Sequence, residues 1–404
     1  MDFDETTEEA AFREEARSWL VANAPSADEL KGLSGMEAAK LWQKRKADGG
    51  WACIRWPKEF GGREASAIEN VILSQEEAKL DLPETGVFSI GQGMAAPTLM
   101  AWADKNAQSR FIPRLASGED IWCQLFSEPA GGSDLAALRT KAEKDGDEWV
   151  INGQKIWTSG AHYSDWGILV VRTDPTVPKH QGLTYFYLDM KSPGIEIKPI
   201  RQISGESNFN EVYFTDVRIP DSQRMGNVGD GWKVSLTTLM NERASIGSGG
   251  GGVKFDALKD LAQTVNIGDR PAIEDSAVRA KLARWYVEEA GLKYTSFRTL
   301  SAISRGETPG PENSIGKLVG ARKAQDMASY AIDLLEQQGI VRDADFDERF
   351  GSLFQDTYMA IPGLRIAGGT DEIMANIIAE RVLGLPQEPR ADKGIPFNEV
   401  PTGN

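Results

Sequence analysis

The sequence of 404 residues predicts an α+β protein, mainly α, in which two helical regions enclose one region of strands. Apolar residues recur every three to four positions up to about residue 118 and again after residue 231, as in amphipathic helices. Between residues 121 and 220 the apolar period falls to two, as in half-buried strands. We therefore expect an N-terminal helical domain at 1–119, a middle antiparallel β-barrel-like domain at 120–230, and a C-terminal four-helix bundle with its tail at 231–404.

The N-terminal region begins with a clearly marked helix. Thr6 and Glu9 have the spacing of a capping box, in which the two side chains satisfy backbone N–H groups at the helix start. Phe12 and Leu20 then fall on one helical face, and Pro25 ends the pattern. Further stretches with helical periodicity follow up to residue 118, so the whole region is expected to be helical.

The middle region alternates strand-like stretches with turn residues. Asn152-Gly153, inside "EWVINGQKIW", is the dipeptide typical of a two-residue hairpin turn, so we expect a hairpin there. Other stretches with strand character are 166–173, 183–190, 195–200 and 210–220.

Helices return in the C-terminal region. A polar loop rich in proline and glycine at 304–314 precedes a predicted helix at 314–338. A later helix ends at Gly384, with Pro386 beyond it as a stop signal. The helix at 314–338 places six apolar residues along one face: Ile315, Leu318, Val319, Met327, Ala331 and Leu334.

The composition excludes several classes of function. A formal charge of −15 would repel nucleic acid and anionic membranes, so neither is an expected partner. The acidic first residues differ from a secretion signal, and no apolar stretch is long enough to span a bilayer. Two cysteines, Cys53 and Cys123, cannot build a disulfide framework, and no metal-ligand cluster is present. We expect a cytoplasmic protein without metal.

The stretch "LMNERASIGSGGGG" at 239–252 has two interpretations. Its glycines, Gly247-x-Gly249-x-x-Gly252, match a dinucleotide-binding loop. Such a loop must follow a strand, whereas a helix-like run precedes this one, so the match is better explained by chance. The other interpretation starts from Glu242-Arg243, an acid and a fixed cation side by side, and makes Glu242 a candidate base.

Two motifs in the middle region together resemble the signatures of the acyl-CoA dehydrogenase family. They are "QLFSEPAGGSD" at 124–134 and "NGQKIWTS" at 152–159, and the helix, β, helix order extends the resemblance over nearly the whole chain. The family implies FAD as cofactor and α,β-dehydrogenation of a CoA thioester to the trans-2-enoyl-CoA. A base removes the α-proton while N5 of the flavin takes the hydride.

The resemblance also assigns roles to individual residues. The usual base of the family is a glutamate directly before Gly-Thr, but Gly368 stands at that position. A smaller branch carries its base on a bundle helix one residue before an arginine, which matches Glu242, with Arg243 facing the substrate pocket or CoA. The Gly368 amide is then expected to donate to the thioester carbonyl. The cofactor positions are Phe126 and Ser127 at the flavin pyrimidine edge, Trp157 against the isoalloxazine, Ser159 at N5, Gly132 and Ser133 at the flavin phosphate or CoA, and Thr370 and Glu372 at the adenosine half.

The sequence departs from the family where a neighbouring subunit usually contributes to the flavin site. An Arg-x-x-Phe-Gly motif is not recognisable, and Asp333, Glu336 and Gln337 replace an expected Gln, Gly and Gly. Carboxylates beside a pyrophosphate would repel it. Similar departures occur in a branch of bacterial dehydrogenases that act on steroid side-chain CoA thioesters and share flavin sites between two different subunits. Both a homo-oligomer and an α2β2 assembly are therefore consistent with the sequence.

Several functional alternatives remain open at this point. A flavin oxidase or flavin monooxygenase could use the same fold, and a subunit without its own catalysis could complete a partner's flavin site. The intact motifs at 124–134 and 152–159 favour a catalytic chain. By resemblance, an electron-transferring flavoprotein is the expected electron acceptor.

Overall fold

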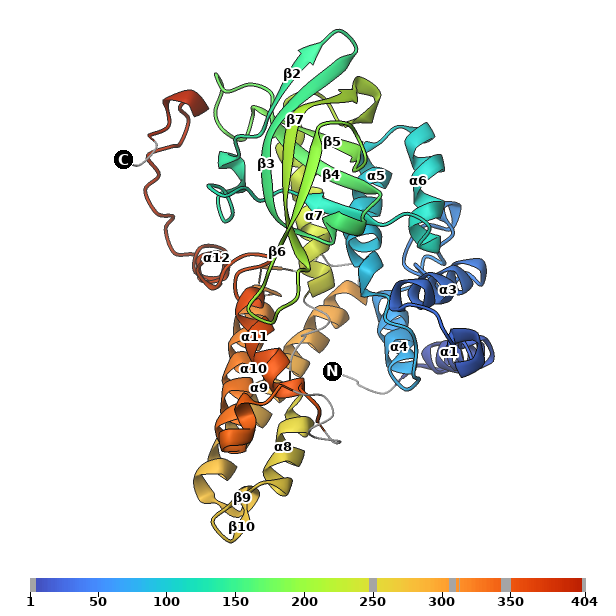
Figure 1. The fold of residues 1–404 in the computed structure, drawn as a ribbon, viewed down its shortest axis with the longest axis vertical. Helices are drawn as coiled ribbons and strands as arrows, with labels where there is room; N and C mark the ends of the chain where they lie inside the picture. The colour runs from blue at the N-terminus through green and yellow to red at the C-terminus, as the bar shows by residue number, and fades with distance from the viewer. Residues whose placement is uncertain (1–4, 247–252, 305–309, 312, 343–349, 402–404) are drawn as a thin grey trace. The chain divides into compact units, whose positions relative to one another are not determined.

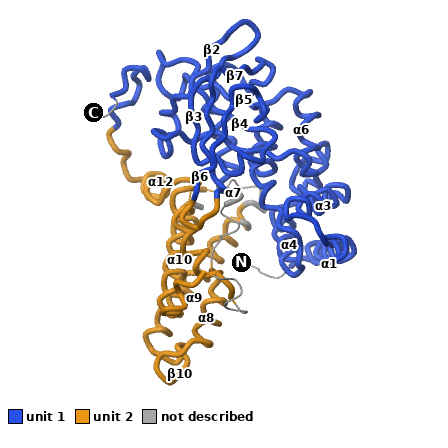
Figure 2. The backbone as a smooth tube through the Cα atoms, in the orientation of Figure 1, with its two compact units in different colours: residues 1–201, 207–242, 390–404 blue, residues 202–206, 243–389 orange. Residues whose placement is uncertain are grey.

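The computed structural model describes residues 5–246, 253–304, 310–311, 313–342 and 350–401. The chain divides into two compact units, coloured separately in Figure 2. Unit 1 comprises residues 1–201, 207–242 and 390–404, and unit 2 comprises 202–206 and 243–389. The glycine loop at 247–252 and most of the loop at 304–314 lie outside the described residues.

The N-terminal part of unit 1 is helical, as predicted (Figure 1). Thr6 caps the first helix in a complete capping box with Glu9, and Phe12 and Leu20 are buried on the expected face. Ser34 begins a later helix in the same way. The helices are α1 (Thr7–Asn23), α2 (Ala27–Leu30), α3 (Gly35–Asp48), α4 (Ala67–Glu77), α5 (Ala96–Trp102) and α6 (Lys105–Ser117).

The middle region forms one open sheet. Its strands are β1 (Trp122–Leu125), β2 (Lys141–Asp145), β3 (Glu148–Ser159), β4 (Trp166–Arg172), β5 (Leu183–Asp189), β6 (Ile195–Ile200), β7 (Phe209–Pro220) and β8 (Arg224–Met225). The strand order is β6-β7-β3-β2-β4-β5-β8, and β1 pairs with β4. The expected barrel does not close in the described residues, because β6 and β8 end the path without pairing with each other. The sheet is also mixed, since β1 runs parallel to β4.

The hairpin predicted at Asn152-Gly153 is wrong. The turn that joins β2 to β3 lies at 146–147, and Asn152 and Gly153 sit inside the continuous strand β3. The register against β7 shifts between Ile151 and Gly153, which marks a bulge. A Cβ atom on Gly153 would approach Oγ1 of Thr140 to 2.6 Å, so glycine serves a close approach of two backbones here.

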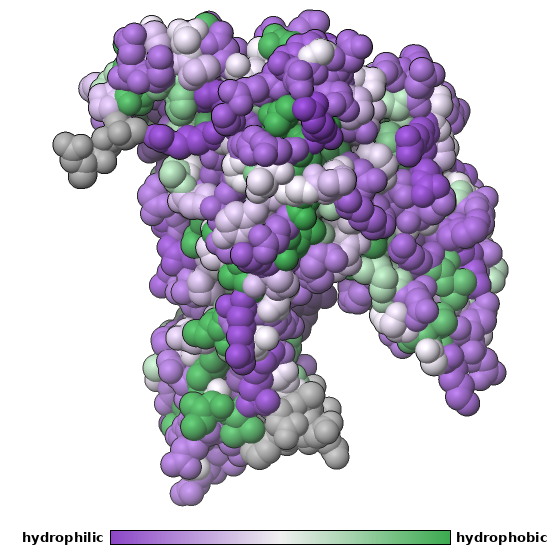
Figure 3. Space-filling model, turned by 45° about the horizontal axis from the view of Figure 1, so that its top comes forward, coloured by the Kyte–Doolittle hydropathy of each residue, from purple (hydrophilic) through white to green (hydrophobic). Residues whose placement is uncertain are grey.

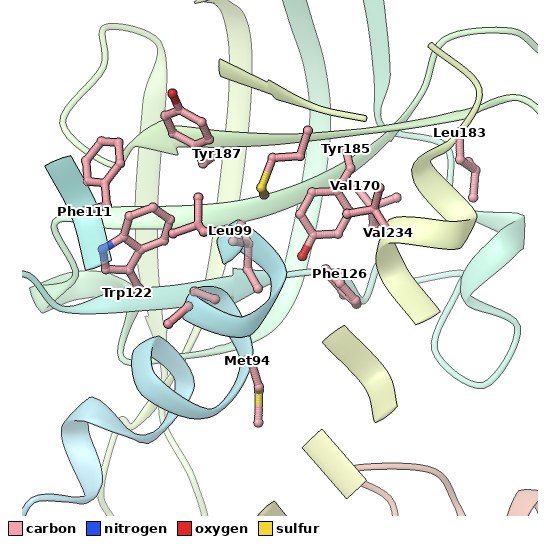
Figure 4. Packing of buried hydrophobic residues seen from close by; sticks show 14 of the residues in the cluster. Met94, Leu99, Phe111, Trp122, Phe126, Val170, Leu183, Tyr185, Tyr187 and Val234 are labelled. Atoms are coloured by element: carbon pink, nitrogen blue, oxygen red, sulfur yellow. The ribbon is translucent and has the colours of Figure 1, made fainter. Parts of the chain in front are cut away.

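The two faces of the sheet pack into separate cores. Ile168 and Val170 of β4 point to one face, and Leu169 and Val171 point to the other, as the strand period of two requires. Buried residues of α5, α6 and the long helix α7 (Gly231–Ile246) cover the first face; Figure 4 shows this cluster, including Phe126 and Tyr185. This face is where the candidate site of unit 1 lies.

Unit 2 is a helical bundle with its own core. Met327 and Ala331, both from the predicted apolar face, are fully buried in that core. Beside them pack Leu258, Trp285 and Phe354 from three other helices. Its elements are α8 (Phe255–Thr264), β9 (Asn266–Ile267), β10 (Arg270–Pro271), α9 (Ser276–Ser304), α10 (Asn313–Leu335), α11 (Leu353–Leu364) and α12 (Asp371–Ile377).

The surface carries some exposed apolar side chains. Val287, Ile340, Ile366 and Leu383 of unit 2 are each more than half exposed. Hydrophobic colour is visible between hydrophilic areas in Figure 3. Among the described residues, no helix combines the length and apolar character that a bilayer crossing requires.

Candidate functional site

Phe126 and Ser127 lie directly after β1, against the middle of β3. Phe126 is buried, with its ring edge-on to Tyr185 at a centroid distance of 5.7 Å. The amide of Ile156 donates to the carbonyl of Ser127 at 2.9 Å. This bond ties Ser127 to the strand residue that precedes Trp157, so the two sequence motifs meet in unit 1.

A buried ion pair holds these two motifs together. The Lys155 ammonium lies 2.8 Å from the Glu128 carboxylate and 3.1 Å from the Phe126 carbonyl. Burial alone would raise the pKa of Glu128, but Lys155 and donors at Thr140 and Arg139 leave it lowered. Burial lowers the pKa of Lys155, and the Glu128 carboxylate opposes that shift. The pair thus joins both motifs.

Trp157 is held in a strained conformation. Its φ of 59° is left-handed, which costs a bulky residue about 1–2 kcal/mol, and 57% of the residue is exposed. The β3–β7 register shifts between Lys155 and Thr158, and the Asn210 amide donates to the Thr158 carbonyl at 2.9 Å. Ser159, half-buried, pairs with Phe209. Strain that places an indole outward is typical of a functional position.

Gly132 and Ser133 lie on an exposed loop whose continuation is fixed by two buried cations. Lys179 pairs with Asp134 at 2.5 Å. The Arg172 guanidinium donates to the carbonyl of Ala136 at 2.6 Å and to that of Leu138 at 3.1 Å. The loop therefore has a rigid base, although Ser133 itself is open to solvent.

The tail of the chain returns to the same two cations. Asp392 forms an ion pair with Lys179, and the Phe397 ring lies 3.5 Å from the Arg172 guanidinium. The Phe397 amide also donates to the Val177 carbonyl at 3.0 Å. Burial lowers the pKa of Arg172 to about 10, and neighbouring carboxylates oppose that shift. The tail at 390–400 is thus part of unit 1 and covers the support of the Ser133 loop.

Glu242, the candidate base, lies near the C-terminal end of α7 and is half-buried. Its Oε2 atom accepts from the side-chain amide of Gln124 at 3.4 Å. Gln124 is on β1, two residues before Phe126, so the carboxylate lies beside the strand that leads to Phe126 and Ser127. The side chain of Arg243 lies outside the described residues.

Gly368, Thr370 and Glu372 lie in unit 2, at the turn before α12. Gly368 and Gly369 have φ values of 65° and 98°, which glycine adopts without strain. Thr370 caps α12 by accepting from the Ile373 amide at 3.2 Å. Hydrogen bonds lower the pKa of the exposed Glu372 carboxyl, from its own backbone and from Thr370. The turn therefore leads directly into the capped start of α12.

Charged side chains hold this turn. The Lys317 ammonium, from α10, donates to the carbonyls of Gly369 and Arg365. The Asp371 carboxylate accepts from Arg365 at 2.8 Å and from Arg322 at 2.9 Å. Burial would raise the pKa of Asp371, but the two arginines leave it lowered. Lys317 and Arg322 thus fix the turn that carries Gly368 to the bundle.

The structure brings Phe126, Ser127, Trp157, Ser159 and Glu242 into one unit, and it gathers the Gly368 turn in the other. The motifs did not predict a supporting role for three residues: Gln124, Lys155 and Lys317. A charged residue inside a motif marks Lys155, and a lysine on a largely apolar helix marks Lys317. A polar residue between Trp122 and Phe126 at the strand period marks Gln124. No group of three or more metal-ligating side chains occurs among the described residues.

The helix, sheet, helix order of the fold agrees with one class of flavin-dependent oxidoreductases. Models of the N-terminal, middle and C-terminal domains of acyl-CoA dehydrogenase match residues 6–119, 123–217 and 229–383. The chain belongs to the acyl-CoA dehydrogenase family, whose members are FAD-dependent oxidoreductases.

Individual relatives agree with this assignment. The chain is 38% identical over 387 residues to acyl-CoA dehydrogenase IpdE1 of Mycobacterium tuberculosis, covering 93% of this chain and 98% of the relative. It is 40% identical over 358 residues to acyl-CoA dehydrogenase FadE34 of the same organism, covering 87% of this chain but 47% of that relative.

Solved structures show the same three-region fold. The ChsE4-ChsE5 complex of Mycobacterium tuberculosis superposes with a TM-score of 0.79 at 28% identity, covering 96% of this chain and 100% of that chain. A steroid acyl-CoA dehydrogenase described as Tcur3481-Tcur3483 gives a TM-score of 0.80 at 28% identity, with 96% and 100% coverage.

Proposed function

We propose that this protein dehydrogenates an acyl-CoA thioester between its α and β carbons, with Glu242 as the base that removes the α-proton. The observation that carries this proposal is the carboxylate of Glu242 within 3.4 Å of Gln124, on the strand leading to Phe126 and Ser127. Gly368 has no carboxylate to offer at the position that the family generally uses, so a second source of the base is required.

The residues of unit 1 fit a flat cofactor. Trp157 has an exposed indole, and Ser127 and Ser159 are half-buried. The buried pair of Lys155 and Glu128 joins the two motifs that carry these residues. We propose that Phe126 and Ser127 hold the pyrimidine edge, that Trp157 lies against the ring system, and that Ser159 donates near N5. When bound, FAD supplies the acceptor for the hydride that leaves the β carbon.

Unit 2 and the Ser133 loop supply the remaining contacts in this proposal. Gly132 and Ser133 serve the phosphates of FAD or CoA, and Thr370 and Glu372 serve the adenosine half of FAD. The Gly368 amide donates to the thioester carbonyl, which stabilises the negative charge that develops there as the α-proton leaves. Arg243 faces the substrate.

The proton transfer makes two demands on the chain's own residues. A carboxylate in water is too weak a base for an α-proton, so the site must exclude water and place Glu242 against the α carbon. The half-buried position of Glu242 beside β1 meets the first demand in part. A donor at the carbonyl assists the same transfer by making the α-proton more acidic, which is the task assigned to Gly368.

We also propose a bulky acyl group as substrate and an assembly with a different subunit. Two of the similar solved structures each carry two protein names, ChsE4-ChsE5 and Tcur3481-Tcur3483. The second is a steroid acyl-CoA dehydrogenase. Asp333, Glu336 and Gln337 are exposed at the end of α10, where a homotetramer would donate neutral groups to a neighbour's cofactor. A homo-oligomer is the alternative. An electron-transferring flavoprotein is the proposed electron acceptor.

Glu242→Gln tests the base. The variant should bind FAD as the parent does, while the rate of flavin reduction by acyl-CoA falls by about 10³-fold. Reduction is followed anaerobically by bleaching of the flavin with butyryl-, octanoyl-, cyclohexane-1-carbonyl- and steroid side-chain CoA thioesters. Glu211→Gln is the matched control, because Glu211 also accepts from a glutamine amide, at 3.2 Å. Normal bleaching by Glu242→Gln would refute the base assignment.

The same preparations test the assembly and the choice between dehydrogenase and oxidase. Flavin counted per chain, with the mass of the complex, shows whether the chain alone holds a full complement of FAD. Reoxidation of the reduced flavin by air should be slow for a dehydrogenase. Fast reoxidation with peroxide release would assign the chain to the oxidases instead.

A further inference from the structure

Gln124 occupies a position where the sheet calls for an apolar residue. Trp122 and Phe126 precede and follow it at the strand period of two, and both are buried in the core under α5, α6 and α7. The alternate residues Cys123 and Leu125 are fully buried in the other core. Gln124 is half-buried on this face, so its amide loses part of its hydration and gains from a polar partner there.

That partner is Glu242. The Gln124 Nε2 atom donates to Oε2 of the carboxylate at 3.4 Å, from a strand whose backbone is fixed by pairing with Ile168 of β4. The bond is long, as contacts of catalytic groups often are before substrate closes the site. We propose that Gln124 is the positioning residue of the base and holds the Glu242 carboxylate in place. This inference rests on the proposed function.

A cluster of three hydroxyl groups, from three elements of unit 1, begins one helical turn before Glu242. Thr238, one helical turn earlier on α7, lies 2.9 Å from the Tyr185 hydroxyl of β5 and 2.9 Å from the Thr98 hydroxyl of α5. Burial raises the pKa of Tyr185, a bond to Thr238 opposes this, and the Glu242 charge raises it further. Tyr185 therefore stays protonated. Arg243 follows Glu242 on its own helix.

A primary amide suits both protonation states of a base. Before the reaction its N–H donates to the carboxylate, which favours the charged form and lowers the pKa of Glu242. The α-proton then passes from the substrate carbon to Glu242, and FAD, when bound, would accept the hydride from the β carbon. After a turn of the amide, the Gln124 carbonyl oxygen can accept from the new carboxylic acid. No covalent bond of Gln124 forms or breaks during this step.

Gln124→Met tests the inference, because methionine has similar length and offers no donor. Loss of the donor raises the pKa of Glu242, so more of the base is protonated at low pH. The acidic limb of the kcat profile should move up by about 1 pH unit. Gln154→Met is the matched control: it removes the amide bond to Glu211 and should leave the limb in place. The substrate is whichever panel thioester bleaches the parent fastest.

Two further measurements keep the inference open to refutation. Acetoacetyl-CoA, whose acidic α-proton the base removes on binding, should bind Gln124→Met with its pH dependence shifted in the same direction. Gln124→Glu, of the same size, places a second carboxylate beside Glu242 and should shift the limb further, even if the methionine variant folds poorly. A uniform loss of activity with an unmoved limb would overturn the inference, as would an equal shift in Gln154→Met.

Failure of this inference can be told apart from failure of the proposed function. If Glu242→Gln abolishes reduction and Gln124→Met leaves the limb unmoved, the base stands and Gln124 does not position it. If Glu242→Gln reduces its flavin normally, the base assignment fails and the role of Gln124 fails with it.

Discussion

Two segments proposed to meet the same cofactor are held in opposite ways. In unit 1 the Phe126–Trp157 junction rests on Lys155 and Glu128, whose side chains are 0% and 6% exposed. In unit 2 the buried Asp371 is held by Arg322 and Arg365, whose side chains are 53% and 38% exposed. Both partners of the first support are sealed in a core, whereas in the second only the carboxylate is sealed and the two cations reach water. Their responses to mutation, acid and salt should therefore differ.

Lys155→Met should have the largest effect. It leaves the Glu128 carboxylate buried without a cation, which costs about 3–5 kcal/mol of folding free energy. Urea unfolding measures the loss. Lys141→Met is the control, because Lys141 forms an exposed pair with Glu143 and should lose no more than about 1 kcal/mol. Equal losses in both variants would contradict the role given to burial.

Asp371→Asn should have a smaller effect. The two arginines that it releases can turn to solvent, so the expected loss is about 1 kcal/mol. Asp256→Asn, at an exposed site in the first turn of α8, controls for the general benefit of an acid at a helix start. A loss as large as that of Lys155→Met would show that the Gly368 turn depends on a sealed interaction after all.

Acid should also destabilise both supports. The loss of unfolding free energy per carboxylate should be smaller than the losses expected from the two substitutions. The pKa values of Glu128 and Asp371 are lowered by their cationic partners, so each contributes stability above its unfolded pKa of about 4. That contribution is lost as the pH falls through the lower, folded-state pKa. Unfolding free energies measured from pH 6 to pH 3 should fall less steeply in Glu128→Gln than in Glu211→Gln. Parallel curves would remove Glu128 from this account.

Salt should distinguish the two supports by the smallest margin. At 1 M salt the screening length is about 3 Å, which weakens exposed pairs and leaves buried ones nearly intact. The destabilisation caused by Asp371→Asn should shrink by a few tenths of a kcal/mol in 1 M NaCl, in line with the small energy of exposed pairs. The destabilisation caused by Lys155→Met should stay the same. A salt-sensitive Lys155→Met would indicate water at the buried pair.

Much of the fold could be predicted because its signals are local. The capping box of Thr6 and Glu9 and the buried face with Met327 and Ala331 depend on residues near in sequence, and both are confirmed. Asn152-Gly153 predicted a turn that is absent there, because glycine is used both in turns and where two backbones approach closely. Its value here is the close approach of Thr140, which is a contact that no local pattern contains.

The site was predictable only where motifs carried it. The resemblance assigns roles to Trp157 and Ser127 that stay predictions, whereas the strained φ of Trp157 depends on a register shift against β7 that no motif contains. Gln124 and Glu242 are 118 residues apart. Their contact exists because α7 covers the face of the sheet to which Gln124 of β1 belongs. That arrangement arises only when the core is assembled. Lys317 reaches the Gly369 carbonyl in the same long-range way.

The position of the tail has a consequence for how the protein is made. Phe397 and Asp392 are synthesised after all of unit 2, yet they cover Arg172 and Lys179 in unit 1. At ordinary translation rates the chain between Arg172 and Phe397 takes roughly 10 to 45 s to emerge. Throughout that interval the base of the Ser133 loop lacks its last contacts. A premature stop codon after Pro389 would therefore damage a loop encoded more than 200 codons earlier.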